Sequence, residues 1–156
     1  MKVPTRRFWS LAGLGLLVTF GAIQLVPYGH THLNPPVVGE PAWDSSATRA
    51  LAQRACFDCH SNETEWPPYA RVAPASWLVQ YDVNKGRSVL NFSEWQRRQE
   101  DAVEAAEEVL EGKMPPAMYA LMHAHARLTD VEREKLAGGL ARTIAATYTG
   151  EEGERD

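Results

Sequence analysis

The sequence predicts a mainly α-helical protein with no β-sheet. An apolar stretch fills residues 8–26, and two capping boxes further along precede apolar residues that recur at helical spacing. Segments rich in glycine or proline separate these stretches. We therefore expect an N-terminal transmembrane helix followed by one domain of four or five helices.

Residues 1–7 form a basic leader with three positive charges, and residues 8–26 contain three polar positions in 19. A helix of this length spans about 28 Å, enough to cross the core of a bilayer. The basic leader predicts a cytoplasmic start, so the remainder would lie in the periplasm of a bacterium, anchored once in the inner membrane. A cleaved signal peptide is the alternative. The length of the stretch and the lack of an Ala-x-Ala-like site after it favour an anchor.

Residues 27–43 are too rich in proline and glycine for a helix and are expected to form an extended tether. His30 and His32 lie in it. They could bind a metal or a haem from elsewhere, although histidines in such segments are more often solvated.

Residues 44–148 are expected to form the helical domain. Its helices are bounded by capping residues, prolines and glycines: Asp44 or Ser45 to Cys56, about Val72 to Val83 with Asn84 or Gly86 as the stop, Ser93 with Gln96 to Gly112, and Thr129 with Glu132 to about Tyr148. Gly138-Gly139 in the last helix predicts a close approach by another backbone, for which the first helix of the domain is the candidate. Residues 149–156 have nothing apolar to bury and are expected to be disordered.

The most informative segment is Cys56-Phe57-Asp58-Cys59-His60, which contains both cysteines of the chain. Two thiols three positions apart, with a histidine directly after the second, match the attachment site of c-type haem. On one turn of backbone, both sulfurs can form thioethers to the two vinyl groups of one porphyrin. His60 then lies under the iron as an axial ligand. The pattern predicts one covalent haem c.

Three other interpretations of the two cysteines are weaker. A thioredoxin-like pair needs a strand before it and a helix after it, and residues 62–68 do not read as a helix. A structural disulfide is less favoured still. Zinc would need two further ligands, and the four remaining candidates, His30, His32, His123 and His125, have no finger-like spacing.

Met114 is the predicted sixth ligand of the iron, because two prolines stiffen the loop in which it stands. A thioether opposite histidine raises the reduction potential of a haem. Met114 filling a gap in the core is the alternative. The rivals for the sixth position are Met118, Met122, His123 and His125. Four aromatic residues that follow the cysteines are candidates for core packing or for a haem wall: Trp66, Tyr69, Trp77 and Tyr81.

All 20 acidic residues follow Val26, whereas three of the 16 basic residues precede it. The expected exported part is therefore net-negative, which excludes nucleic acid as a plausible partner. A negative surface suits docking to a basic redox partner, and it also simply keeps a domain soluble.

The chain resembles the haem-binding domain family of small, membrane-anchored, cytochrome c-like bacterial proteins. The resemblance covers roughly residues 34–140 and is carried by these blocks: Asn34-Pro35-Pro36, Cys56 to Thr64, Trp66-Pro67-Pro68-Tyr69, Ala73 to Leu78, Asn91-Phe92-Ser93 and Met114-Pro115-Pro116. It implies a cytochrome c-like helical domain around one haem held by Cys56, Cys59 and His60. Members often have an aromatic residue where Pro68 stands, so one wall of the pocket is expected to differ.

The leading functional hypothesis is a membrane-tethered, periplasmic electron carrier rather than an enzyme. Its partners would be redox proteins of the respiratory membrane and the c-type haem attachment machinery. The first alternative is a five-coordinate haem that binds a small molecule or turns over peroxide, with His123, His125 or Arg127 on the distal side. The second is a haem-bearing subunit of a larger redox complex.

Overall fold

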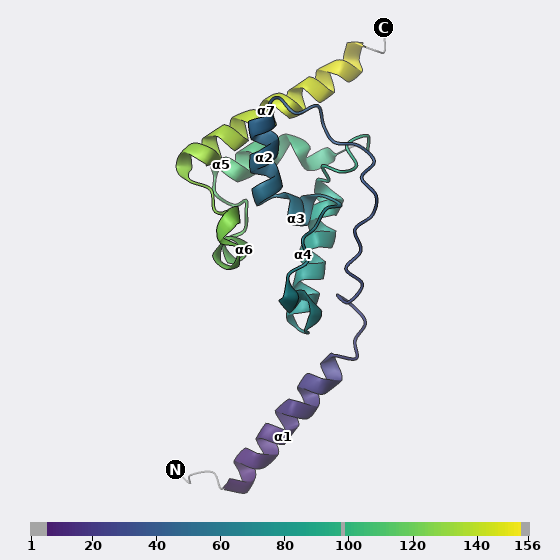
Figure 1. Cartoon of the computed structure of the whole chain (residues 1–156), viewed down its shortest axis with the longest axis vertical. Coiled ribbons are helices and arrows are strands. Elements are labelled where there is room, and N and C mark those ends of the chain that lie inside the picture. The colour runs from purple at the N-terminus through teal and green to yellow at the C-terminus, as the bar shows by residue number, and fades with distance from the viewer. Residues whose placement is uncertain (1–5, 98, 154–156) are drawn as a thin grey trace. The chain divides into compact units, whose positions relative to one another are not determined.

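The computed structural model describes residues 6–97 and 99–153, and over these ranges the chain is helical (Figure 1). Their one β feature is an isolated bridge between Gly39 and Glu94. The predicted mainly α-helical class is therefore confirmed. The chain forms two compact units. The first unit comprises Met1–Leu33 and Trp66–Asp82, and the second unit comprises Asn34–Glu65 and Val83–Asp156.

The first unit contains α1 (Arg6–Ile23), the 3-10 helix η1 (Pro68–Arg71) and the beginning of α4 (Ala75–Val89). The expected transmembrane helix over residues 8–26 is not supported, since no helix in the described ranges is long and apolar enough to span a bilayer. The physical reason lies at its two ends. α1 begins with two arginines, and after Ile23 the chain turns. Gln24 exchanges two hydrogen bonds of 2.9 and 3.0 Å with the backbone of Ala73.

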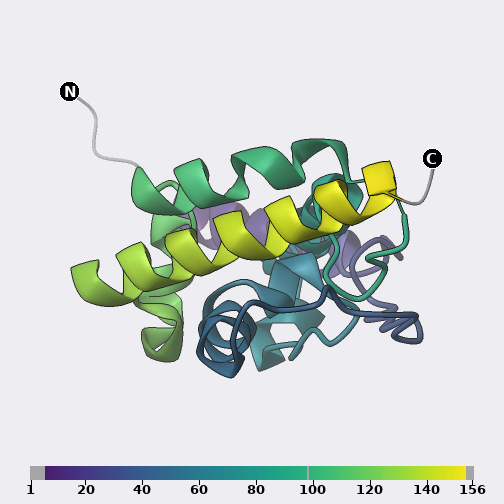
Figure 2. The same cartoon turned by 90° about the horizontal axis from the view of Figure 1, so that it is seen from above.

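The second unit contains the end of α4 and most of the helical elements: α2 (Ser46–Ala55), α3 (Phe57–His60), η2 (Glu100–Glu104), α5 (Ala105–Leu110), α6 (Ala117–Met122), η3 (Ala124–Ala126) and α7 (Asp130–Gly153). α7 packs against both α2 and α5 (Figures 1 and 2). Ten buried side chains form the core of this unit: Ala52, Phe57, Leu90, Phe92, Ala102, Val109, Leu136, Ala137, Leu140 and Ile144. The helices outnumber the expected four or five because α3 and α6 are short helices of their own.

Three helix ends lie where the capping residues predict them. The Ser45 hydroxyl accepts the Thr48 N–H at 3.2 Å and caps α2. Thr129 and Glu132 form the reciprocal capping box of α7, with hydrogen bonds of 2.9 and 3.2 Å. Gly112 follows α5 with a φ of +73°, a backbone conformation that favours glycine.

Other boundaries differ from the prediction, because tertiary contacts override the local pattern. α4 runs through Gly86 to Val89, since this glycine packs on a neighbouring segment instead of ending the helix. The Ser93 hydroxyl accepts the N–H of Asn62 at 2.9 Å, so it does not cap a helix at Gln96, and helical structure resumes only at η2. α7 continues to Gly153, into the stretch expected to be disordered.

Gly139 packs on α2, the predicted partner helix, but the contact is with the side chain of Thr48 and not with backbone as expected. A Cβ on Gly139 would overlap the hydroxyl and methyl groups of Thr48, which is 3% exposed. On Gly138 the nearest atom is the end of the flexible Arg142 side chain, at 3.3 Å. The two adjacent glycines therefore occupy different environments.

Gly139→Ala is expected to lower the free energy of unfolding by about 2 kcal/mol, because Thr48 is short, branched and buried and has no room to move. Gly138→Ala should be neutral or raise it by about 0.5–1 kcal/mol through helix propensity. Urea unfolding of both variants measures the difference. Equal effects from the two substitutions would show that the contact between α2 and α7 is not tight.

Glu40 fixes the irregular segment before α2 onto that helix. Its carboxylate accepts two hydrogen bonds from the Arg49 guanidinium, at 2.6 and 2.7 Å, and one from Trp43 Nε1 at 2.7 Å. The Arg49 hydrogen bonds are the main cause that lowers the pKa of Glu40 below its ordinary value, against the opposing effect of burial. A carboxylate with a lowered pKa stabilises the folded state above its ordinary pKa, and this stabilisation is lost as the pH falls through the lowered value.

Glu40→Gln is expected to cost about 1 kcal/mol of stability at pH 7. The difference from the unsubstituted protein should shrink between about pH 5 and pH 3, where Glu40 itself becomes protonated. Urea midpoints measured across this range test the prediction. A difference that stays constant with pH would contradict it.

Candidate functional site

The two cysteines and His60 lie on one tight turn at the end of α2. The Cys56 N–H donates to Ala52 at 2.8 Å, and the Cys56 carbonyl accepts the N–H groups of Cys59 and His60 at 3.1 and 2.9 Å. α2 thus ends at Cys56, as its sequence predicts, and the short helix α3 follows directly. Both cysteines are free thiols and half-buried.

The orientation of the His60 ring is set by the chain just after α4. His60 Nδ1 lies 3.0 Å from the carbonyl oxygen of Leu90. A carbonyl only accepts, so Nδ1 carries the proton and the neutral ring has its lone pair on Nε2. Histidines that bind metals usually have this arrangement. Burial is the main cause that lowers the pKa of His60, while the carbonyls of Leu90 and Gly86 oppose it.

α4 packs directly on the turn at Gly86. A Cβ on this residue would overlap the carbonyl oxygen of Cys59 and lie 2.8 Å from the carbonyl carbon. Gly86 therefore lets two backbones approach more closely than any side chain would allow. The same approach brings the end of α4 into position for the hydrogen bond between His60 and Leu90.

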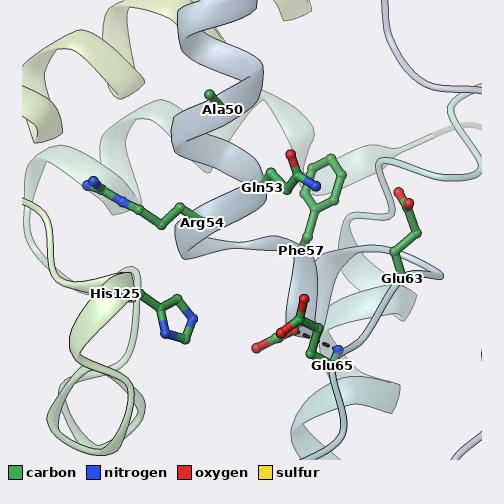
Figure 3. A pocket seen from close by; sticks show the side chains of 8 residues that line it. Ala50, Gln53, Arg54, Phe57, Glu63, Glu65 and His125 are labelled. Carbon is green, nitrogen blue, oxygen red and sulfur yellow. Dashed lines mark hydrogen bonds between the residues drawn. The ribbon is translucent and has the colours of Figure 1, made fainter.

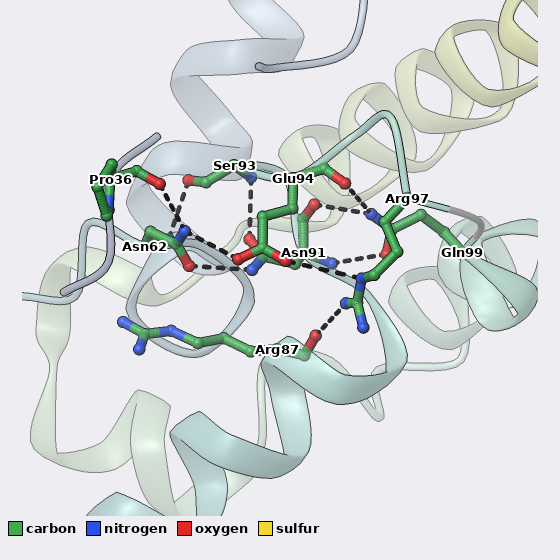
Figure 4. Close-up of polar contacts among 8 residues, drawn as sticks. All are labelled: Pro36, Asn62, Arg87, Asn91, Ser93, Glu94, Arg97 and Gln99. Atoms are coloured by element: carbon green, nitrogen blue, oxygen red, sulfur yellow. Dashed lines mark hydrogen bonds and ion pairs between the residues drawn. The ribbon is translucent and has the colours of Figure 1, made fainter. Parts of the chain in front are cut away.

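Buried amides hold the loops on both sides of this contact (Figure 4). Asn91 Nδ2 donates to Asn62 Oδ1 at 3.0 Å, and Asn91 Oδ1 accepts the Ser93 N–H at 2.9 Å. The Gln99 side chain exchanges two hydrogen bonds of 2.9 and 3.0 Å with the backbone of Asn91. We call Asn62, Asn91, Ser93 and Gln99 the amide cluster. It joins the loop after His60 to the loop after α4.

Arg87 extends these contacts toward the start of the second unit. Its Nε donates to the Ser61 carbonyl at 2.8 Å, and its Nη2 donates to Asn34 Oδ1 and Thr64 Oγ1 at 3.0 and 2.9 Å. No sequence pattern indicated Arg87 or Gln99, although the partners of Arg87 lie in two of the blocks that carry the family resemblance. The partners of Arg87 are 23 to 53 residues away in sequence, so no local pattern indicates them.

Met114 lies in the loop between α5 and α6, as predicted. Its N–H donates to the Glu108 carbonyl at 3.0 Å, and its half-buried side chain packs against the core of the second unit. Of its rivals, Met118 and Met122 are exposed on α6 and His125 is exposed, whereas His123 is half-buried. Its Nδ1 lies 3.1 Å from the Tyr119 carbonyl.

α6 is joined to the cysteine turn through Asp58. The Tyr119 hydroxyl donates to Asp58 Oδ2 at 2.5 Å, across 61 residues of sequence. The structure therefore brings Cys56, Cys59 and His60 together on one turn and attaches to that turn the helix that follows Met114.

A pocket of about 370 Å³ adjoins the same turn (Figure 3). Phe57 and Asp58 line it, together with Glu63, Glu65 and residues of α2, whereas neither cysteine nor His60 does. Arg54 and the sixth-ligand candidate His125 also line it, but its three carboxylates outnumber the arginine and make it a poor site for the two propionates of a haem.

The aromatic candidates Trp66, Tyr69, Trp77 and Tyr81 all belong to the first unit. Within that unit the His32 ring lies tilted against Trp66 with ring centroids 4.8 Å apart, and its Nε2 lies 2.8 Å from the Ala70 carbonyl. His32 thus has structural partners, and His30 is exposed.

The competing interpretations of the two cysteines find no support. A helix, not a strand, precedes them. Burial, followed by the neighbouring Cys59, raises the pKa of the Cys56 thiol to about 12, whereas reactive cysteine pairs have lowered values. Among the described residues there is no group of three or more His, Cys, Asp or Glu side chains that could hold a metal ion.

The donor set fits a haem. Two free thiols flank a turn that ends in a histidine whose Nε2 carries a lone pair. On α6, attached to this turn, Met118, Leu121 and Met122 expose large apolar side chains that suit contact with a porphyrin.

The model of a family described as haem-binding domain matches residues 18–142 of the chain. No curated protein and no solved structure matched it.

Proposed function

Because the chain belongs to the haem-binding domain family, we propose that it is a monohaem c-type cytochrome that carries single electrons. The observation that supports this most directly is the hydrogen bond from His60 Nδ1 to Leu90, on the turn that contains both free thiols. A bound haem c supplies reversible one-electron transfer at its iron.

In this proposal Cys56 and Cys59 hold the haem through thioethers, and His60 and Met114 are the two axial ligands. Leu90 keeps the proton on Nδ1 of His60 and so leaves Nε2 for the iron. The hydrogen bond from the Met114 N–H to α5, together with the following prolines, restricts the methionine. Met118, Met122, His123 and His125 remain the rivals for the sixth position.

We place the haem domain in the bacterial periplasm, because c-type haem is normally attached on that side of the inner membrane. The partners would be the attachment machinery and redox proteins of the respiratory membrane. The excess of acidic residues after Val26 suits partners with a basic docking face.

Expression in a host with c-type haem attachment machinery tests the covalent link. The denatured polypeptide should keep its colour, and its mass should increase by one haem. The Cys56→Ser/Cys59→Ser double variant is the matched control and should lose both signals. A colourless polypeptide of unmodified mass would contradict the proposal.

Met114→Ala is expected to abolish the methionine-to-iron charge-transfer band of the oxidised protein and to lower the reduction potential. Visible spectra and a redox titration measure both effects. Met118→Ala and Met122→Ala are matched controls that should keep the band. Loss of the band in one of these variants, with retention in Met114→Ala, would move the ligand to α6.

The packing of Met114 against the core favours one second candidate, a five-coordinate haem that binds a small molecule or turns over peroxide. Carbon monoxide discriminates between the two functions. Immediate binding to the reduced protein supports an open iron, and an unchanged spectrum supports ligation by His60 and a methionine.

A further inference from the structure

Asp58 lies between the two cysteines, in the turn formed by Cys56 to His60, which we call the attachment turn. It connects this turn to two other segments. Its Oδ1 accepts the N–H of Glu65 at 2.9 Å, and its Oδ2 accepts the Tyr119 hydroxyl at 2.5 Å. Its backbone carbonyl accepts the Thr64 hydroxyl at 2.7 Å. The attachment turn is therefore fixed to the loop that follows it and to α6.

α6 gains little from packing. It has six residues, none of them buried, and among the described elements it contacts η3, the 3-10 helix that directly follows it. Arg127 donates two hydrogen bonds, to the Ala120 and Leu121 carbonyls at 2.8 and 3.0 Å. Both are local in sequence and do not join α6 to another segment. The position of so short and exposed a helix depends strongly on a hydrogen bond to a carboxylate.

The Met114 loop lies between two anchors. At one end the Met114 N–H is bonded to the Glu108 carbonyl in α5. At the other end Pro115 and Pro116 lead into α6, whose first turn is closed by the bond from the Ala120 N–H to the Pro116 carbonyl at 2.9 Å. Only four residues lie between Met114 and Tyr119, so a displacement of α6 would be passed to the methionine.

We propose that the hydrogen bond between Tyr119 and Asp58, which we call the strut, sets the spacing between the attachment turn and the Met114 loop. Tyr119 is then a positioning residue for the sixth ligand of the iron. This inference rests on the proposed attachment of haem at Cys56, Cys59 and His60. It adds that Asp58, inside the attachment motif, would also restrict the movement of the Met114 loop and so the access of small molecules to the iron.

Tyr119→Phe in the haem-loaded protein tests the strut, because it removes the hydroxyl and keeps the ring. Hydrogen exchange of the α6 amides should accelerate at least tenfold, and carbon monoxide should bind the reduced protein at least tenfold faster. Tyr28→Phe, at a tyrosine 43% exposed in the first unit, is the matched control and should change neither rate. Unchanged exchange in Tyr119→Phe would overturn the proposal.

A double-mutant cycle with Asp58→Ala separates the strut from a general loosening. If the strut exists, adding Tyr119→Phe to Asp58→Ala should give no further acceleration of α6 exchange. Independent, additive effects of the two substitutions would refute it. If the unsubstituted protein lacks the methionine-to-iron band, the ligand assignment to Met114 fails. The exchange measurements still decide on the strut, because they do not depend on which residue binds the iron.

Discussion

Replacing Gly86 with alanine is expected to destabilise the second unit by about 3 kcal/mol and to lower the yield of covalent haem. The added methyl group would overlap the Cys59 carbonyl, and both neighbours are backbone, which cannot rotate away. α4 would have to move off the turn. Because Leu90 directly follows α4, the same movement would lengthen the hydrogen bond that orients the His60 ring.

Urea unfolding followed by circular dichroism measures the loss of stability, and haem staining of the denatured polypeptide measures the yield. Gly138→Ala is the matched control, since its methyl group would meet only the flexible end of Arg142. If Gly86→Ala and Gly138→Ala behave alike, the close approach between α4 and the turn does not exist in solution.

Asn91→Asp is expected to cost about 3–5 kcal/mol at pH 7. The two side chains have nearly the same shape, but the substitution replaces the Nδ2 donor with a charged oxygen facing Asn62 Oδ1 at 3.0 Å. Asn91 is 2% exposed, so water cannot solvate the charge. The loop after His60 and the loop after α4 should separate.

Acid should partly rescue this variant, because a protonated carboxyl group can again donate to Asn62. Unfolding free energies measured at pH 7 and at about pH 4 test both statements. Gln96→Glu adds the same charge at an exposed position of the same segment and should change stability by less than about 0.5 kcal/mol. Equal losses of unfolding free energy in the two variants would contradict an amide cluster that is buried from water.

The parts of the fold that follow from short-range rules were predictable. Ser45, Gly112 and the Thr129–Glu132 pair bound helices because their partners lie within a few residues. The attachment turn was predictable for the same reason. The turn consists of five consecutive residues, Cys56 to His60, all placed by the end of one helix.

What could not be predicted depends on distant partners. Ser93 has the local signature of a helix cap, yet its hydroxyl accepts a hydrogen bond from the N–H of Asn62, 31 residues away. Gly86 is a residue type that commonly ends a helix, yet it lies within α4 and packs against the backbone of Cys59. The proposed second iron ligand depends on loops that meet only after folding, such as the one joined to Asp58 through Tyr119, so sequence spacing alone leaves several candidates for it.

The amide cluster has a consequence for acid tolerance. Its side chains are amides and a hydroxyl, which neither gain nor lose a proton over the ordinary range of pH. The hydrogen bonds among these four side chains therefore do not depend on pH, whereas the one from Asn62 Nδ2 to Glu94 Oε1, at 3.2 Å, involves a carboxylate. Acid strong enough to protonate Glu40, whose pKa is lowered, should release its hydrogen bonds to Arg49, while the hydrogen bonds within the amide cluster are kept.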